Sequence, residues 1–223
     1  MCSSRGPVAQ VRPDGGNDTA YTSLPLPPHN DGCYMRDQPG FQMFHCLQPA
    51  VSGGDSTLID GVALATKLSE EHSDTLQFLA NPFNRITYHH TDKQDVFLQS
   101  RPVFSRFTPT TSHLPSPEDI ERIHFNDIDR APLSAEYAPI SALGPHMKGF
   151  YQHWLNLMHT LVSPDLELRL ALRPGHVLIF DNLRTLHGRT EFDASSGRVL
   201  SGCYGRVEDY ESAHRASCAA LRS

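Results

Sequence analysis

Short apolar and aromatic runs, separated by turns rich in Gly, Pro and Asp, recur along most of the chain. Runs such as "FQMFHCL" and "HVLIFDN" are too short for typical helices and are rich in residues that favour strands. Pro-Gly and Ser-Gly turns bound several of them. The pattern predicts strands at residues 41–47, 57–59, 85–90, 95–100, 102–107, 123–125, 167–172, 176–182 and 198–207.

Two segments instead have the three- and four-residue spacing of amphipathic helices. Residues 62–80 carry apolar positions at helical spacing, with Asp60 before them as an N-cap and Pro82 after them as a stop. Residues 144–162 repeat the spacing from Met147 to Leu161. The last segment of the chain, about 15 residues, reads as a short terminal helix.

Many short strands with two inserted helices predict an α+β or mainly β domain rather than alternating βαβ units. A double-stranded β-helix, the jelly-roll core of cupin-like proteins, fits this order of elements. Residues 1–16 read as a disordered or divergent tail. No repeat or linker divides residues 17–223, which we take as one domain.

Charge and composition exclude several classes of protein. The 223 residues carry a net charge of −6 with both signs interspersed, so no basic face for nucleic acid or a membrane surface is expected. No apolar run reaches the roughly 18 residues of a membrane span, and the start lacks the apolar region of a secretory signal. The five cysteines have wide spacings, which indicates free thiols in a reducing compartment, with Cys46 and Cys203 buried in strands.

His29 and Asp31, in "PPHND", form an H-x-D pair whose side chains point the same way in extended backbone. With the distant His187 they would form the two-histidine, one-carboxylate set of non-haem Fe(II) oxygenases. Zinc prefers thiolates or a third histidine, and neither accompanies this pair. Taken alone, the pair also fits a chance occurrence in a solvated turn, and His187 also fits a hydrogen-bonded core histidine.

Arg198 strengthens the metal interpretation. It follows His187 after the turn "DASSG" and begins the strand "RVLSGCY". If residues 176–180 and 198–204 pair as antiparallel strands, its guanidinium can project into the barrel beside the metal. A buried guanidinium there suits the distal carboxylate of 2-oxoglutarate, whereas a surface arginine is the plain alternative.

An ordered series of motifs then makes the chain recognisable. "HND", "GGDST" and "FDNLRTLHGR" with the arginine that follows resemble the taurine-dioxygenase-like branch of the Fe(II)/2-oxoglutarate oxygenases. "NDTAYT", "GFQMFHCL", "HFNDIDRA" and "GCY" are similar to the carnitine-biosynthesis members of this family, the trimethyllysine and γ-butyrobetaine dioxygenases. The resemblance runs from Asn17 to the C-terminus, so it implies that residues 17–223 are the catalytic domain.

The resemblance implies an enzyme that hydroxylates N6,N6,N6-trimethyllysine at C3 with Fe(II), 2-oxoglutarate and O2, and with ascorbate as reductant. γ-Butyrobetaine hydroxylation and an inactive truncated form are the alternatives. The implied partner is a small molecule with a trimethylammonium group, not a nucleic acid or membrane, and a homodimer is one option. The implied location is the mitochondrial matrix, with the cytoplasm as the alternative.

Roles for five side chains follow from the same resemblance. His29, Asp31 and His187 bind the iron. Arg198 anchors 2-oxoglutarate, and Ser56, in "GGDS", can donate a hydrogen bond to the co-substrate's carboxylate. A turn hydroxyl without a ligand is the alternative for Ser56.

Four further residues match substrate contacts of the family. Tyr21 and Tyr204 match an aromatic cage for trimethylammonium, which has no N–H and is held by aromatic faces. Asn126, in "HFND", matches a contact to the substrate head. Asp18 favours trimethyllysine, because a carboxylate can pair with its ammonium and repels the lone carboxylate of γ-butyrobetaine. Ordinary strand tyrosines and a solvated turn aspartate are the alternatives.

The chain also departs from the family. Family members are longer and carry a zinc-bound domain and the first barrel strands before the H-x-D segment, so we expect a barrel that is incomplete on its N-terminal side. "DNLR" has leucine where tryptophan is usual. "HND" has asparagine where threonine is usual.

Overall fold

The computed structural model describes residues 9–11, 22–91, 95–106, 116–133 and 140–220. Its strands and helices are β1 (Ala9–Val11), β2 (Leu26–His29), β3 (Phe41–Gln48), β4 (Ser56–Asp60), α1 (Gly61–Glu71), α2 (Ser73–Leu79), β5 (Ile86–Thr91), β6 (Val96–Arg101), β7 (Phe104–Arg106), β8 (Ile120–Ile123), α3 (Ile140–Leu161), β9 (Glu167–Leu170), β10 (Val177–Asp181), β11 (Thr185–Arg189), β12 (Val199–Gly205) and α4 (Val207–Ala220).

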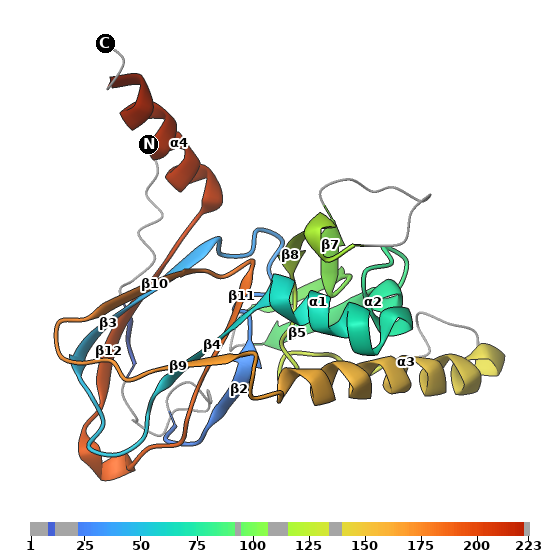
Figure 1. Cartoon of the computed structure of the whole chain (residues 1–223), viewed down its shortest axis with the longest axis horizontal. Helices are drawn as coiled ribbons and strands as arrows, with labels where there is room; N and C mark the ends of the chain where they lie inside the picture. The colour runs from blue at the N-terminus through green and yellow to red at the C-terminus, as the bar shows by residue number, and fades with distance from the viewer. Residues whose placement is uncertain (1–8, 12–21, 92–94, 107–115, 134–139, 221–223) are drawn as a thin grey trace.

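Two four-stranded sheets form the barrel that lies on the left of Figure 1. One sheet has the order β1-β12-β3-β10 and the other β2-β11-β4-β9, and all neighbouring strands are antiparallel. Neighbours such as β3 and β12 are far apart in sequence, as expected for a double-stranded β-helix. The predicted mainly β jelly roll with inserted helices is therefore confirmed.

The segment between β4 and β9 forms a separate layer of helices and hairpins beside the barrel (Figure 1). Its hydrophobic core includes Ile59 of β4 and Leu186 of β11 as well as side chains of α1, α2 and α3. Because side chains alternate along a strand, the neighbouring His187 points to the opposite face, into the barrel. On β4 and β11, this alternation gives an apolar outer face that packs on the helices and an inner face that carries His187.

The predicted pairing of residues 176–180 with 198–204 is wrong. Both strands pair with β3, on its two sides, so β10 and β12 are separated by one strand. The strand that separates them, β3, is distant in sequence. The turns between two consecutive strands do not indicate whether a third strand lies between them in the sheet. Arg198 nevertheless precedes β12 as expected, with 5% of its surface exposed.

Several other local features differ from the expectation. Residues 9–11, in the predicted disordered or divergent tail, form β1, and β2 was not predicted as a strand. The helix predicted at 62–80 is two helices, α1 and α2, which meet at His72, whose φ of −147° and ψ of 64° are not helical. The strand β11 was not predicted, because "TLHGR" has too few apolar residues to stand out. Among the expected buried thiols, Cys46 is buried and Cys203 is half-buried, and both are free.

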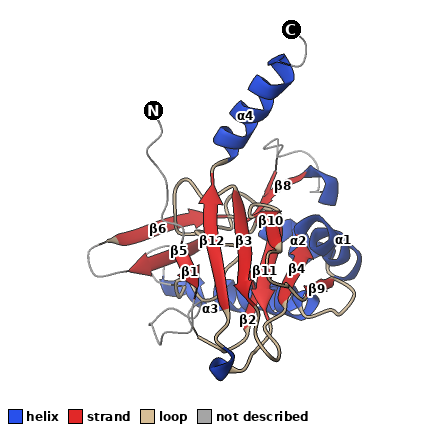
Figure 2. Ribbon diagram, turned by 90° about the vertical axis from the view of Figure 1, so that its left-hand side faces the viewer, coloured by secondary structure: helices blue, strands red, loops and turns tan. Residues whose placement is uncertain are grey.

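The C-terminal helix α4 extends away from the barrel, with no buried residue (Figure 2). This confirms the predicted terminal helix. Within the described residues, no helix combines the length and apolarity that crossing a bilayer requires.

Asp60 caps α1 as predicted and also binds Arg184. Its carboxylate accepts a hydrogen bond from Val62 N at 2.9 Å and contacts Arg184 Nη2 at 2.7 Å. We expect Asp60→Ala to lower the free energy of unfolding by about 1 kcal/mol, mainly through the lost cap. Thermal unfolding should show a Tm lower by roughly 2–4 °C. Asp60→Asn, which retains the cap and loses the charge, should lose less; an equal loss would contradict the capping role.

Candidate active site

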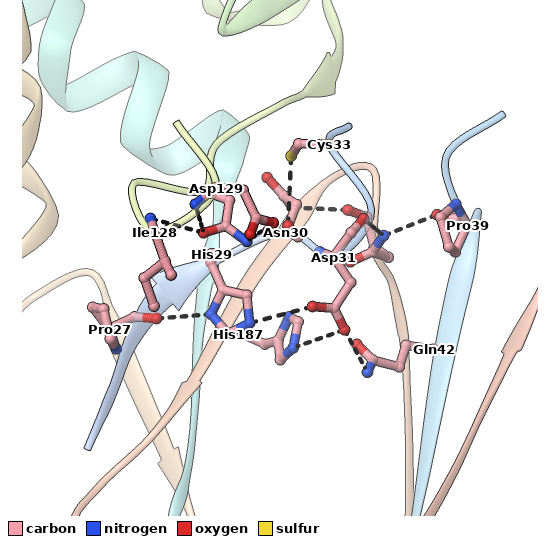
Figure 3. Close-up of polar contacts among 12 residues, drawn as sticks. Pro27, His29, Asn30, Asp31, Cys33, Pro39, Gln42, Ile128, Asp129 and His187 are labelled. Carbon is pink, nitrogen blue, oxygen red and sulfur yellow. Dashed lines mark hydrogen bonds and ion pairs between the residues drawn. The ribbon is translucent and has the colours of Figure 1, made fainter. Parts of the chain in front are cut away.

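His29, Asp31 and His187 converge at one end of the barrel (Figure 3). His29 ends β2, Asp31 lies in the turn that follows, and His187 lies in the centre of β11. In the antiparallel pairing of β11 with β2, His187 is directly opposite His29. One potential ligand atom from each of the three residues lies within 4.8 Å of the others. The structure thus brings together side chains that are 156 positions apart in sequence (187 − 31).

The two imidazoles present Nε2 to the two oxygens of one carboxylate. His29 Nε2 lies 3.4 Å from Asp31 Oδ1, and His187 Nε2 lies 3.6 Å from Asp31 Oδ2. His29 Nδ1 is 2.8 Å from the carbonyl oxygen of Pro27, which can only accept, so Nδ1 carries the proton. A carbonyl partner on Nδ1 is the usual way in which proteins orient a metal-binding histidine.

The charges in the site depend on one another. Burial raises the pKa of Asp31, but the imidazoles of His187 and His29 outweigh burial and hold it well below its usual range. Burial and the nearby His29 lower the pKa of His187 to about 3. For His29, burial lowers the pKa, but the hydrogen bond and charge of Asp31 give a net increase. The carboxylate is therefore ionised and His187 neutral at pH 7, the forms that bind a metal.

The donor set fits a divalent transition metal. Two imidazoles and one carboxylate are the donor set of non-haem Fe(II) oxygenases. The separation of 3.6 Å between His187 Nε2 and Asp31 Oδ2 is longer than a hydrogen bond. A cation shared by the three groups would bind the two Nε2 atoms and Asp31 Oδ1 in place of these long contacts. The ring of His187 also packs against Phe180, at 4.9 Å between centroids, and against Phe44, which keeps that side of the site apolar.

Asp31 Oδ2 receives two further hydrogen bonds from the barrel wall. Gln42 Nε2 donates at 2.8 Å and the hydroxyl of Tyr204 at 2.7 Å. Gln42 and Tyr204 are direct cross-strand neighbours on β3 and β12. The predicted cage residue Tyr204 therefore also contacts a candidate metal ligand, and Oδ1 is the oxygen that stays open toward a metal. Gln42 was not predicted; the alternation along "FQMFHC" could have placed it on the inner face.

Arg198, the candidate co-substrate anchor, lies with Arg189 against one aromatic ring. The guanidinium of Arg198 lies against the ring of Phe192 at 5.2 Å, and Arg189 lies against the same ring at 4.9 Å. Arg189 is two residues after His187, so both side chains leave β11 on the same face. Ser56 is the cross-strand neighbour of Arg189 and is buried. Arg189 was not predicted, although "HGR" places it next to the metal ligand.

Arg198 is a buried cation with few protein partners. It donates to the carbonyl of Gly54 at 3.4 Å, and no carboxylate in the described part of the chain forms an ion pair with it. Burial lowers the pKa of Arg198, although a guanidinium stays charged at pH 7. Arg198, Gly54, Cys46 and Leu200 contribute to the lining of a cavity of about 250 Å³.

Of the other predicted substrate residues, Asn126 lies within the described part of the chain. Asn126 is buried, and its side chain organises a tight turn: Oδ1 accepts from Ile128 N at 3.1 Å, and Nδ2 donates to Asp129 at 2.8 Å. This turn lies beside His29 (Figure 3). Asp18 and Tyr21 lie outside the described residues.

Comparison with known proteins agrees with this geometry. The model of the taurine catabolism dioxygenase TauD, TfdA family matches residues 3–204. Trimethyllysine dioxygenase of Meyerozyma guilliermondii is 32% identical over 200 residues, which cover 88% of this chain and 46% of that protein. γ-Butyrobetaine dioxygenase of Homo sapiens is 30% identical over 190 residues, which cover 84% and 46%. Mitochondrial trimethyllysine dioxygenase of Mus musculus is 30% identical, with 86% and 42% covered. The chain thus spans less than half of the length of these relatives.

Solved structures with low sequence identity share the fold. An asparagine oxygenase in complex with Fe(II), 3-hydroxyasparagine and succinate superposes with a TM-score of 0.64 at 18% identity, covering 88% of this chain and 56% of its own. The non-haem iron oxygenase OrfP, in complex with Fe and α-ketoglutaric acid, gives 0.59 at 14% identity, covering 89% and 56%. At these identities the likeness establishes the jelly-roll architecture alone.

Proposed function

Because the chain belongs to the TauD, TfdA family of dioxygenases, we propose that it is an Fe(II)- and 2-oxoglutarate-dependent dioxygenase that hydroxylates trimethyllysine at C3. The convergence of His29, Asp31 and His187 carries the proposal. These three residues would hold an Fe(II) ion, which would supply the oxygenase chemistry when bound.

The protein's own groups bind, orient and exclude water. His29, Asp31 and His187 would hold the iron, which supplies the activation of O2 and 2-oxoglutarate when bound. Gln42 and Tyr204 orient the carboxylate of Asp31 through its Oδ2 atom. No side chain in this site is needed as a general base.

Arg198 would bind the distal carboxylate of 2-oxoglutarate. A buried guanidinium normally pairs with an anion, and the described acidic residues provide none here. The planar fork of arginine matches a carboxylate with two parallel hydrogen bonds. Ser56, across the strand pair from Arg189, would contribute a hydroxyl to the same anion.

The substrate assignment rests on the trimethylammonium group and on its distal end. Tyr204, with 54% of its surface exposed, presents an aromatic face beside the metal ligands and would form the cage with Tyr21. Asn126 and Asp18 would bind the amino-acid end of trimethyllysine. γ-Butyrobetaine is the second candidate substrate, because the human γ-butyrobetaine dioxygenase is about as similar as the trimethyllysine enzymes.

The test is a succinate-formation assay on the purified chain with Fe(II), 2-oxoglutarate and either substrate. We expect substrate-dependent succinate and a hydroxylated product, with a higher kcat/KM for trimethyllysine. A higher kcat/KM for γ-butyrobetaine would make γ-butyrobetaine the assigned substrate instead of trimethyllysine. Absence of iron(II) uptake and of turnover with both would contradict the function and leave a non-catalytic role.

Asp18→Asn tests the choice between the two substrates. Removing its charge should raise KM for trimethyllysine by roughly 5- to 30-fold, the effect of losing one ion pair of about 1–2 kcal/mol. KM for γ-butyrobetaine should fall or stay constant, because a repulsive charge is removed. Equal changes with both substrates would contradict a role in selection. Asp209→Asn, at an exposed aspartate of α4, is the control.

The proposal also includes a pathway and a location in the cell, which are inferred from the relatives. Several similar proteins are mitochondrial trimethyllysine dioxygenases, which supports a role in carnitine biosynthesis and a mitochondrial location. Ascorbate as reductant and assembly as a homodimer stay predictions. Mass photometry and an ascorbate-dependence assay on the purified chain would test them.

A further inference from the structure

Asn30, the residue between His29 and Asp31, has no exposed surface. A fully buried amide, with two N–H donors and an acceptor oxygen, needs a partner for each of these groups. The proposed iron site does not account for this side chain, because it does not face the ligand atoms of its two neighbours.

Every polar position of the Asn30 side chain has a backbone partner on another segment. Nδ2 donates to the carbonyl of Asn182 at 2.8 Å and to the carbonyl of Thr185 at 3.1 Å. Oδ1 accepts from Phe125 N at 3.1 Å. The backbone N–H of Asn30 returns a hydrogen bond to the carbonyl of Phe125 at 2.7 Å. One side chain thus joins the H-x-D segment to two segments that are distant in sequence.

Asn182 makes the reciprocal contacts. Its Oδ1 accepts from Asp31 N at 3.0 Å, and its Nδ2 donates to the carbonyls of Asp31 at 3.0 Å and Pro39 at 2.9 Å. It too has no exposed surface. Asn30 and Asn182, which we call the asparagine pair, therefore fix the backbone on both sides of the Asp31 carboxylate.

The segments that the asparagine pair joins all lead to the active site. Thr185 begins β11, two residues before His187. Phe125 directly precedes Asn126 and the turn that lies beside His29. The first and third metal ligands and the candidate substrate turn are thus tied to one buried amide. A shift of Asn30 would move His29 and Asp31 together, since both are its direct neighbours in the chain.

We propose that Asn30 is a positioning residue that sets the three metal ligands relative to one another and to the substrate turn at residues 126–129. The inference rests on the proposed function, because it takes the three ligands to hold iron. Outer partners that orient metal ligands typically contribute 10- to 100-fold to metal affinity. Because the substrate turn is bound to the same side chain, Asn30 also links the position of the substrate to the position of the metal.

The test replaces Asn30 with isosteric aspartate. Asn30→Asp keeps an acceptor for Phe125 N but sets carboxylate oxygens against the carbonyls of Asn182 and Thr185. We expect roughly 10- to 100-fold weaker Fe(II) binding to the metal-free protein, measured below the unfolding transition. The charge-transfer band of the Fe(II)–2-oxoglutarate complex should shift, and more succinate should form per hydroxylated product.

Two variants make the result decisive. Asn84→Asp is the matched control, because Asn84 Nδ2 also donates to a backbone carbonyl, that of Phe78 at 3.1 Å, but away from the site. It should change stability and leave Fe(II) affinity and product coupling unchanged. If Asn30→Asp does not fold, Asn30→Ser, which is uncharged and lacks the two amide N–H donors, takes its place.

The outcomes separate this inference from the proposed function. Folded Asn30 variants with Fe(II) affinity and coupling within threefold of the wild type would overturn the inference and leave the enzyme assignment intact. If Asn30→Asp and Asn84→Asp weaken Fe(II) binding equally, Asn30 has only a structural role, and the inference is overturned as well. If the wild-type chain itself takes up no Fe(II), the proposed function fails, and this inference fails with it.

Discussion

Replacing His187 with alanine is expected to abolish high-affinity Fe(II) binding, and with it all 2-oxoglutarate turnover. His187 provides one of three protein ligands, and its Nε2 faces Asp31 Oδ2 at 3.6 Å. Loss of a direct ligand should exceed the effect of an outer partner, so we expect more than about 100-fold weaker binding. Metal analysis after anaerobic loading and the charge-transfer band with 2-oxoglutarate measure this directly.

The alanine variant also creates a cavity against Phe44 and Phe180, so a second variant is needed. His187→Gln retains bulk and polarity but removes the imidazole, and it should lose iron to a similar degree while keeping a Tm closer to the wild type. His214→Ala, in the exposed helix α4, is the matched control and should bind iron normally. A His187→Gln protein that keeps one tightly bound Fe(II) would rule out the three-ligand site.

Local sequence signals were sufficient for most of the elements and for the H-x-D pair. Side chains two apart in extended backbone share a face whatever the tertiary structure, so His29 and Asp31 could be paired before any fold was known. The Asp60 cap and the short apolar strands are equally local. The motif "FDNLRTLHGR" then added His187, although β11 itself carries no clear strand pattern.

Long-range contacts could not be derived in this way. The order β12-β3-β10 depends on which strands pair across the barrel, and periodicity within a strand does not encode its partner. The contact between Asn30 and Asn182 joins residues 152 positions apart, and both asparagines read as ordinary turn residues in the sequence. Arg189 was not predicted for the same reason. Its proximity to Arg198 arises because both guanidinium groups lie against the ring of Phe192.

Replacing Arg198 with methionine is expected to raise KM for 2-oxoglutarate without loss of Fe(II) binding. The substitution removes a buried cation that has no acidic partner among the described residues, so the carboxylate of the co-substrate would be buried alone. Removing one partner of such a pair costs about 2–5 kcal/mol, or roughly 30- to 3,000-fold in affinity. KM for trimethyllysine at saturating 2-oxoglutarate should stay within a few-fold of the wild type.

Arg198→Lys separates charge from shape. Lysine keeps the positive charge but offers a point charge in place of a planar fork, so an intermediate KM is expected if the carboxylate is bound through two parallel hydrogen bonds. Arg206→Met, an exposed arginine beyond the other end of β12, is the matched control and should leave KM for 2-oxoglutarate unchanged. An unchanged KM in Arg198→Met, with iron still bound, would move the anion site elsewhere, and the buried neighbour Arg189, whose guanidinium lies against the same Phe192 ring, would be the next residue to replace.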